Sequence, residues 1–250
     1  MTGAGERKDT EVKKSEVDFM DIKILDTKEN QVKFLVKGTN PAFANALRRT
    51  MMAGLNILAV EDVHFYQNTS VMFDEMLAHR LAMIPLKMDS KKYKAGEKVK
   101  LVLEKEGPCT VYSKDIKSTD PTIEPAFGNI PITELAEGQS LKLEMDAIAG
   151  RGTTHSKYQP AIVSYTEMPS IVDKSGKKSA YKADLLEMIL DEKKRDIIVK
   201  DNEKIEYDST AFIFTVESHG NLEPKELIIA AVEELTEKSK EFRQELKNLS

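Results

Sequence analysis

The chain has 250 residues, of which 40% are hydrophobic and 32% charged, with a formal net charge of -5 and a single cysteine, Cys109. This length is enough for one or two domains with a buried core. One thiol forms neither an internal disulfide nor a cysteine-rich metal site, which excludes a disulfide-stabilised secreted scaffold. The net negative charge argues against a protein that binds DNA by itself, because binding to phosphates needs clustered positive charge.

The first 15 residues are polar and charged, and they contain no apolar core of the kind found in a signal peptide. We interpret residues 1–15 as a disordered lead. No stretch of the sequence approaches the roughly 20 apolar residues that are needed to cross a bilayer. We therefore expect a cytoplasmic protein with no membrane partner.

A β-hairpin is predicted after this lead. Residues 17–24 hold apolar side chains in irregular alternation, and residues 31–37 alternate regularly. Turn-forming residues occupy positions 26–30 between them. One face of this hairpin should be buried against the helix that follows.

That first helix is predicted from Asn40 to Gly54. Asn40 can cap it by accepting backbone N–H bonds, and Pro41 fits the first helical position, where no N–H is needed. Gly54 suits a left-handed residue at the other end. One narrow apolar face recurs every four residues and consists of Phe43, Leu47 and Met51.

Two arginines, Arg48 and Arg49, point away from that apolar face. On the residues alone two interpretations stay open. The pair is either part of a solvated helix face or an anchor in a protein interface, where the planar guanidinium fork is favoured. An apolar helix face beside two guanidinium groups suits protein contact better than catalysis.

A strand and a second helix are predicted next. Residues 57–66 are apolar, β-branched and aromatic in turn, as in a strand. A helix then runs from Asp74, a suitable cap, to Ile84, because Pro85 disfavours helical geometry at the residue before it. Its apolar face is formed by Leu77, Leu81 and Ile84. Two polar residues lie to one side of that face: His79 and Arg80.

Short alternating segments separated by turn residues continue the chain. The expected strands are 99–103, 110–116, 141–149 and 161–166. Pro121, Pro125 and Pro131 indicate a loop with short extended pieces between the second and third of these strands. The pattern predicts a compact β-rich unit from residue 56 to residue 168.

A glycine-rich loop runs from Gly150 to Pro160 and contains Arg151 and Lys157, so it could cradle a phosphate. It lacks the GxxxxGK[ST] order, however, and no helix follows to offer its N–H groups. A free-standing nucleotide-binding protein or enzyme that uses Gly150–Gly152 is therefore the alternative hypothesis for the function.

The last part of the chain predicts two helices and a strand. Residues 179–194 have helical spacing, and residues 210–217 are apolar on both faces, as in the centre of a sheet. Pro224 then opens a helix of about 25 residues, a length that needs a partner along its apolar face. That face consists of Leu227, Ala231, Leu235, Phe242, Leu246 and Leu249.

No catalytic or metal-binding constellation is recognisable in the sequence. The four histidines are scattered without HExxH or paired spacing. Acidic neighbours such as Glu61 and Asp62 are expected by chance in so charged a chain, and no DxDxD cluster occurs. We therefore expect no catalytic residue and no metal ligand.

Two long stretches resemble one protein family. They are NALRRTMMAGLNILAVEDVHFYQNTSVMFDEMLAHRLAMIPL, in the first third of the chain, and FIFTVESHGNLEPKELIIAAVEELTEK, near its end. Both are similar to the alpha-type assembly subunits of the multisubunit RNA polymerases of archaea and eukaryotes. The loop at 150–160 also resembles the family's GxGxxHxKxQP segment, which has a structural and assembly role there.

This resemblance implies an α+β fold with a discontinuous dimerisation domain, made from residues 16–55 and 206–250. It implies an inserted β-rich domain at 56–168 and 195–205. Many relatives carry a further small module, in some with four cysteines that hold an iron–sulfur cluster. Residues 169–194 would be a short remnant of it, and we expect no cluster and no other cofactor, because the thiolate ligands are missing.

The resemblance also implies a function and partners. The chain would be a non-catalytic scaffold of DNA-directed RNA polymerase that forms a heterodimer with the smaller subunit L. Subunits N and P would lie nearby, the large catalytic subunits would assemble on the pair, and DNA would be met only through the complex. The implied dimer interface comprises Phe43, Leu47, Met51, Leu227, Ala231, Leu235, Phe242 and Leu246. The implied contacts to the large subunits are Arg48, Arg49, His79 and Arg80.

Overall fold

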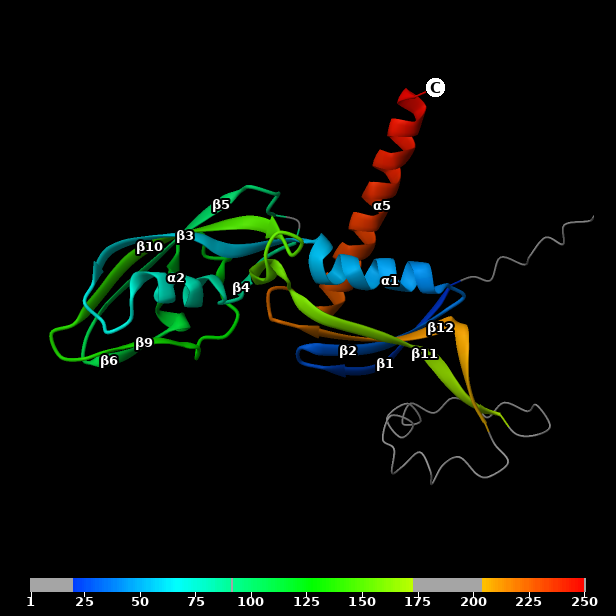
Figure 1. Ribbon diagram of the computed structural model, residues 1–250, viewed down its shortest axis with the longest axis horizontal. Coiled ribbons are helices and arrows are strands. Elements are labelled where there is room, and N and C mark those ends of the chain that lie inside the picture. Colours follow the sequence, from blue (N-terminus) through cyan, green and yellow to red (C-terminus); the bar gives the residue numbers. More distant parts are fainter. Residues whose placement is uncertain (1–19, 91, 173–203, 250) are drawn as a thin grey trace, which may run out of the picture.

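The computed structural model describes residues 20–90, 92–172 and 204–249 (Figure 1). Its first sheet joins segments from both ends of the chain, with four antiparallel strands in the order β1-β2-β12-β11. Their bounds are β1 (Asp21–Lys28), β2 (Gln31–Lys37), β11 (Ala161–Val172) and β12 (Lys204–Ser218). The predicted hairpin is confirmed as the β1–β2 pair.

The central strand of this sheet is β12, which pairs with β2 on one side and β11 on the other. Successive side chains of a strand point to opposite faces. Phe212, Phe214 and Val216 therefore share one face, and Ile213 lies on the other, where it forms a small cluster with Leu35. The prediction of a central strand that is apolar on both faces is confirmed.

Within the described ranges, two helices contact the first sheet: α1 (Pro41–Arg49), which continues into a π-helical turn (Thr50–Gly54), and α5 (Pro224–Asn248). Figure 1 shows α1 lying along the sheet, whereas α5 starts beside it and then projects away. Beneath the helices the rings of Phe34 and Phe214 stack with centroids 5.0 Å apart. The length and start of the last helix agree with the prediction from Pro224.

The start of α1 follows the prediction and its end does not. Asn40 caps the helix, with its Oδ1 accepting the N–H of Phe43 at 2.9 Å, and Pro41 takes the first position. Gly54 is not left-handed. The chain instead leaves the π-helical turn directly into extended backbone at Leu55. The turn is closed by Thr50, whose hydroxyl donates to the carbonyl of Ala46 at 2.9 Å.

The second unit is a sheet in the order β3-β10-β5-β7 with smaller elements packed against it. Its strands are β3 (Asn56–Asn68), β5 (Lys98–Glu106), β7 (Lys117–Ser118) and β10 (Ser140–Arg151). The smaller strand pairs are β4 (Leu86–Lys87) with β8 (Glu124–Pro125), and β6 (Cys109–Tyr112) with β9 (Pro131–Leu135). One α-helix, α2 (Asp74–Ala82), and two single 3-10 turns, Ser113–Asp115 and Ser156–Tyr158, complete it.

The boundary between the two units differs from the prediction. The β-rich unit was expected to extend to residue 168. Instead β11 pairs with β12, with Val163 opposite Val216, so residues 161–172 belong to the first sheet. Alternation predicts that a strand is present but not which strand it pairs with. The expected remnant at 169–194 lies outside the described residues from 173 onward, as do positions 195–203 of the expected insertion.

We use the name terminal unit for the first sheet with α1 and α5, and insert unit for residues 56–160. The two are contiguous in one hydrophobic core, which runs from Phe34 and Phe214 to Leu101 and Leu143. Within the described residues, no helix is both long and apolar enough to cross a membrane.

The stacked pair under the helices should dominate the stability of the terminal unit. Phe214→Ala removes a ring that is 1% exposed, and we expect the free energy of unfolding to fall by about 3–5 kcal/mol in urea denaturation. The matched control is Ile162→Ala on β11, whose side chain is 58% exposed, with an expected change within about 0.5 kcal/mol. Similar losses in both variants would contradict this placement of the core.

Candidate assembly interface

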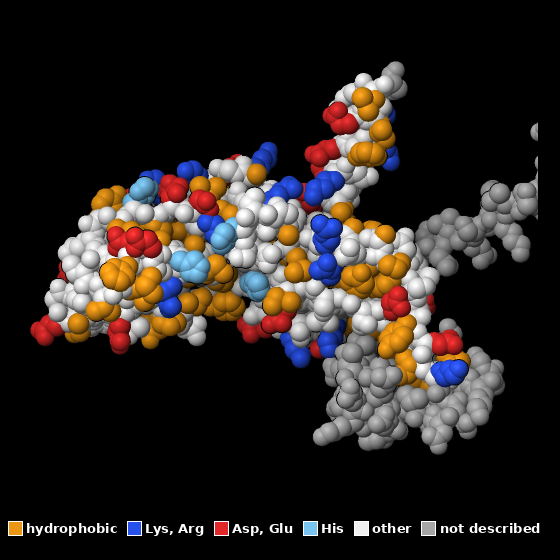
Figure 2. Space-filling model, viewed as in Figure 1, with side chains coloured by type: hydrophobic (Ala, Val, Ile, Leu, Met, Phe, Trp, Pro, Cys, Tyr) orange, Lys and Arg blue, Asp and Glu red, His pale blue; other side chains and the backbone are white. Residues whose placement is uncertain are grey.

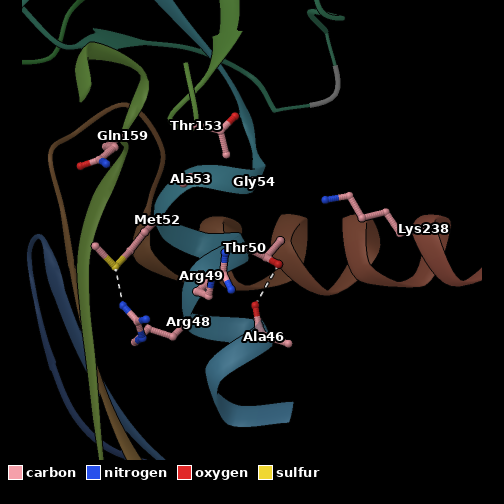
Figure 3. A pocket seen from close by; sticks show the side chains of 10 residues that line it. All are labelled: Ala46, Arg48, Arg49, Thr50, Met52, Ala53, Gly54, Thr153, Gln159 and Lys238. Carbon is pink, nitrogen blue, oxygen red and sulfur yellow. Dashed lines mark hydrogen bonds between the residues drawn. The ribbon is translucent and has the colours of Figure 1, made fainter. Parts of the chain in front are cut away.

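A positively charged hollow lies where α1 ends (Figure 3). It has a volume of about 390 Å³, and among the residues that the structure describes its charged lining consists of Arg48, Arg49 and Lys238, without a carboxylate. Arg48 is held in place, because its guanidinium donates to Asn45 Oδ1 at 3.0 Å and to Met52 Sδ at 3.2 Å. Arg49 is exposed. The geometry therefore presents one fixed and one accessible guanidinium on the same turn, which suits a partner that brings carboxylates.

The second conspicuous surface is the free half of α5, which we define as residues 236–249. Every residue in it is exposed. Phe242 is 67% exposed, Leu246 51% and Leu249 85%, and they share one side of the helix at spacings of four and three. In Figure 2 hydrophobic side chains line the projecting helix, with acidic residues beside them.

The structure corrects part of the predicted dimer interface. Four of its residues are at most 4% exposed and lie in the chain's own core, so they have no surface to offer a partner: Leu47, Met51, Leu227 and Ala231. Phe43 and Leu235 are half-buried against that core. Only Phe242 and Leu246 remain free. Leu249 continues the same apolar stripe, and because it is exposed we add it to the candidate interface.

The four predicted contacts to large subunits are divided between the two units. Arg48 and Arg49 lie in the terminal unit, whereas His79 and Arg80 lie on α2 in the insert unit. Arg80 already has acceptors within the chain, because its Nε donates to the carbonyl of Ile132 at 3.0 Å and its Nη2 to that of Pro131 at 2.6 Å. Arg80 therefore fastens α2 to β9, and His79 beside it is exposed.

Two glycines of the glycine-rich loop, Gly150 and Gly152, are packed against protein atoms and leave no room there for a phosphate. A Cβ at Gly150 would lie 2.5–2.8 Å from the ring of Tyr158, and a Cβ at Gly152 would lie 2.9 Å from Ala53 Cα. Both glycines thus serve close packing. The space that a phosphate-binding loop would offer is filled by the chain itself.

The cations of this loop are also paired within the chain. Arg151 binds Asn56 Oδ1 at 3.1 Å and Glu234 of α5 at 2.9 Å. Lys157, with its side chain 9% exposed, donates to the carbonyl of Val60 at 2.9 Å and pairs with Glu61. The loop therefore connects β3 with α5. The site that the nucleotide-binding hypothesis places at Gly150–Gly152 is occupied by contacts within the chain.

The comparisons with known proteins agree with this architecture. A family model described as the RNA polymerase Rpb3/RpoA insert domain matches residues 63–165. The DNA-directed RNA polymerase subunit Rpo3 of Pyrococcus furiosus is 39% identical over 257 residues, covering 92% of this chain and 98% of the relative. The Rpo3 of Natronomonas pharaonis is 37% identical, covering 90% and 96%, and that of Thermococcus kodakarensis is 37% identical, covering 93% and 100%.

The chain belongs to the Rpo3 family of archaeal DNA-directed RNA polymerase subunits. The resemblance stated from the sequence is thereby confirmed, and Rpo3 is the subunit also called D. The family match at 63–165 covers most of the insert unit that the sheet pairing defines. Among the described residues of this Rpo3-family chain, no three His, Cys, Asp or Glu side chains lie together as metal ligands would.

One titrating cluster stands at the junction of the two units. Hydrogen bonds from Lys157 and Tyr158 lower the pKa of the Glu61 carboxyl below its ordinary value of 4.5. Burial, followed by the hydrogen bond to Glu61, raises the pKa of the Tyr158 hydroxyl. The Tyr158 hydroxyl donates to Glu61 Oε2 at 2.8 Å, and Lys157 pairs with the same carboxylate, so Glu61 accepts from two residues of the loop.

The lowered pKa of Glu61 predicts a pH dependence. Above about pH 4.5 the carboxylate is charged in both the folded and the unfolded chain, and its stabilising effect is complete. As the pH falls below 4.5 towards the folded pKa, the unfolded chain takes up the proton first and the stabilisation is lost. Glu61→Gln should therefore be less stable than wild type near neutral pH, with a gap that narrows in acid.

The measurement is urea denaturation of both proteins across this pH range. Glu106→Gln, which changes a carboxylate on another strand of the insert unit, is the matched control and should track wild type more closely. If the difference in free energy of unfolding between Glu61→Gln and wild type stays constant down to the lowest pH, the stabilising role of the Glu61 carboxylate is contradicted.

Proposed function

We propose that this chain is a non-catalytic assembly subunit of archaeal DNA-directed RNA polymerase. It forms a heterodimer with a smaller homologous subunit, L, and the pair is the platform on which the large catalytic subunits assemble for transcription. Small subunits N and P lie nearby, and the chain is associated with DNA only through the assembled complex. This proposal extends the family membership to particular partners and surfaces of this chain.

The observation that carries the proposal is the free half of α5. The last 13 residues of α5 and its C-cap Leu249 are all exposed, and Phe242, Leu246 and Leu249 form one apolar side. An isolated helical end of this length is marginal in water, because helical stability in proteins comes mainly from packing of the apolar face. A second chain that covers this face supplies that packing.

The positive hollow at the end of α1 supports the second part of the proposal. Arg48 and Arg49 lie on the side of the terminal unit where α1 meets the loop at residues 150–160. Arginine pairs with carboxylates through two parallel hydrogen bonds, which favours it over lysine in interfaces. A large subunit with acidic residues fits this face.

The proposal assigns the chemistry of RNA synthesis to the large subunits. We further propose that this subunit works without an iron–sulfur cluster, because the sequence has only Cys109 and such clusters need several thiolate ligands.

A charge placed on the apolar side of α5 should disrupt the heterodimer. Phe242→Asp together with Leu246→Asp buries two carboxylates without partners, and we expect the affinity for the small subunit to fall about 100-fold or more. The readout is the dissociation constant from titration of the small subunit. Gln244→Asp together with Asn248→Asp adds the same two charges on another side of the helix and should keep wild-type affinity. Equal loss in both double variants, or in neither, would contradict the assigned interface.

The arginine pair should act at a different step. Arg48→Ala together with Arg49→Ala leaves α5 unchanged, so the heterodimer should form normally while docking of the large subunits weakens about tenfold or more. Quantitative co-purification of the large subunits with the tagged heterodimer measures this. Arg243→Ala on the free half of α5 controls for loss of positive charge. Undiminished recovery of the large subunits would remove this role from Arg48 and Arg49.

A further inference from the structure

Lys238 belongs to both of the surfaces that the proposed function uses. It lines the hollow at the end of α1 together with Arg48 and Arg49, although it comes from α5 (Figure 3). It also lies at the start of the free half of α5, which we defined as residues 236–249. A residue that two binding surfaces share can make the occupation of one depend on the occupation of the other.

The hollow is formed by three segments that are far apart in the chain. Among the described residues, its lining comes from the end of α1 with the π-helical turn, from Thr153 and Gln159 of the loop, and from Lys238 of α5. In Figure 3 the amine of Lys238 is directed from α5 towards the turn at Thr50–Gly54. The conformation of this one side chain therefore determines whether the third cation of the hollow is in place.

Contacts within the described chain hold Lys238 only weakly. Its Nζ lies 3.5 Å from Glu234 Oε1, an oxygen that Arg151 Nη2 approaches more closely, at 2.9 Å. The Lys238 side chain is 48% exposed, and exposed ion pairs contribute little to holding a long side chain in one conformation. The Lys238 ammonium can therefore exchange Glu234 for a carboxylate that a partner brings into the hollow.

Lys238 also flanks the apolar side of the free half of α5. It follows the half-buried Leu235 by three residues and precedes Phe242 by four, and residues at these spacings share one side of a helix. A subunit that covers Phe242 and Leu246 would therefore pack on the methylene groups of Lys238 as well. Because the amine is directed into the hollow, this packing would hold it there and remove much of its rotamer freedom.

We propose that Lys238 couples the two contacts of assembly. When a subunit covers the apolar side of α5, the Lys238 ammonium is fixed in the hollow, and the hollow then binds the carboxylates of a large subunit more tightly. This inference rests on the proposed function, from which it takes both occupants, and it adds that one side chain makes their binding cooperative. Such coupling is reciprocal, so a large subunit in the hollow raises the affinity of α5 for the small subunit by the same factor.

The test measures the dissociation constant of the large subunits for the full chain in two states, alone and saturated with the small subunit. For wild type we expect at least about fivefold tighter binding in the saturated state. Lys238→Gln keeps most of the stem without the charge and should reduce this gain to less than about twofold. The matched control is Lys240→Gln, since Lys240 pairs with Glu237 and does not line the hollow, and it should keep the full gain.

Three results would overturn the inference alone. They are equal affinity of the wild-type chain in both states, a full gain with Lys238→Gln, and a loss with Lys238→Gln that is equally large in both states, because Lys238 would then be an ordinary contact. Failure of wild type to bind the small subunit, or undiminished docking of the large subunits on Arg48→Ala with Arg49→Ala, would overturn the proposed function and this inference with it.

Chemical labelling of lysines gives an independent readout. Sulfo-NHS-acetate acetylates accessible amines, and mass spectrometry follows the rate at each site. Saturation with the small subunit should slow acetylation of Lys238 about threefold or more, because the amine then spends less time outside the hollow. Lys142 on β10, whose side chain is 51% exposed, is the matched site and should keep its rate. An unchanged rate at Lys238 would overturn the inference.

Discussion

The pairing of β12 with β2 is the constraint on which the rest of the structure depends. It brings residues near the two ends of the chain into one sheet and stacks Phe34 on Phe214 beneath the helices. Everything between β3 and the loop at residues 150–160 must then lie outside this sheet, which is why the insert unit forms its own. The same pairing determines which surfaces stay exposed. The apolar sides of α1 and of the first half of α5 pack against the sheet, whereas the second half of α5 extends beyond it and stays exposed.

The loop at residues 150–160 links the two units through contacts with both. Its glycines allow backbone to approach Tyr158 and Ala53, and its cations reach Glu61 on β3 and Glu234 on α5. A motif that suggests phosphate binding from composition is therefore an internal clamp. Positions that look chemically active in a sequence are often satisfied within the fold, and only the partners of each donor and acceptor show which case applies.

Several features set by local chemistry were predictable from the sequence, although the end of α1 at Gly54 was not, and features set by distant partners could not be predicted. The cap at Asn40, the central position of β12 and the start of α5 at Pro224 follow from residues within one turn or one strand. The pairing of β11 with β12 depends on a segment far along the chain, and the use of Arg80 depends on carbonyls at 131 and 132. The apolar periodicity of α5 is continuous, so it could not show that Leu227 is buried and Leu246 free.

The placement of α5 has a consequence for how the chain matures. Contacts close in sequence form before distant ones, and domains fold as units during synthesis. The strands of the insert unit are complete by residue 151, whereas β2 lacks its neighbour until β12 has left the ribosome. The helix α5 follows β12 in the chain, and its first half packs on the closed sheet, on the turn at Thr50–Gly54 and on Arg151. The partner proposed for the free half of α5 would therefore meet only chains whose terminal sheet is already closed.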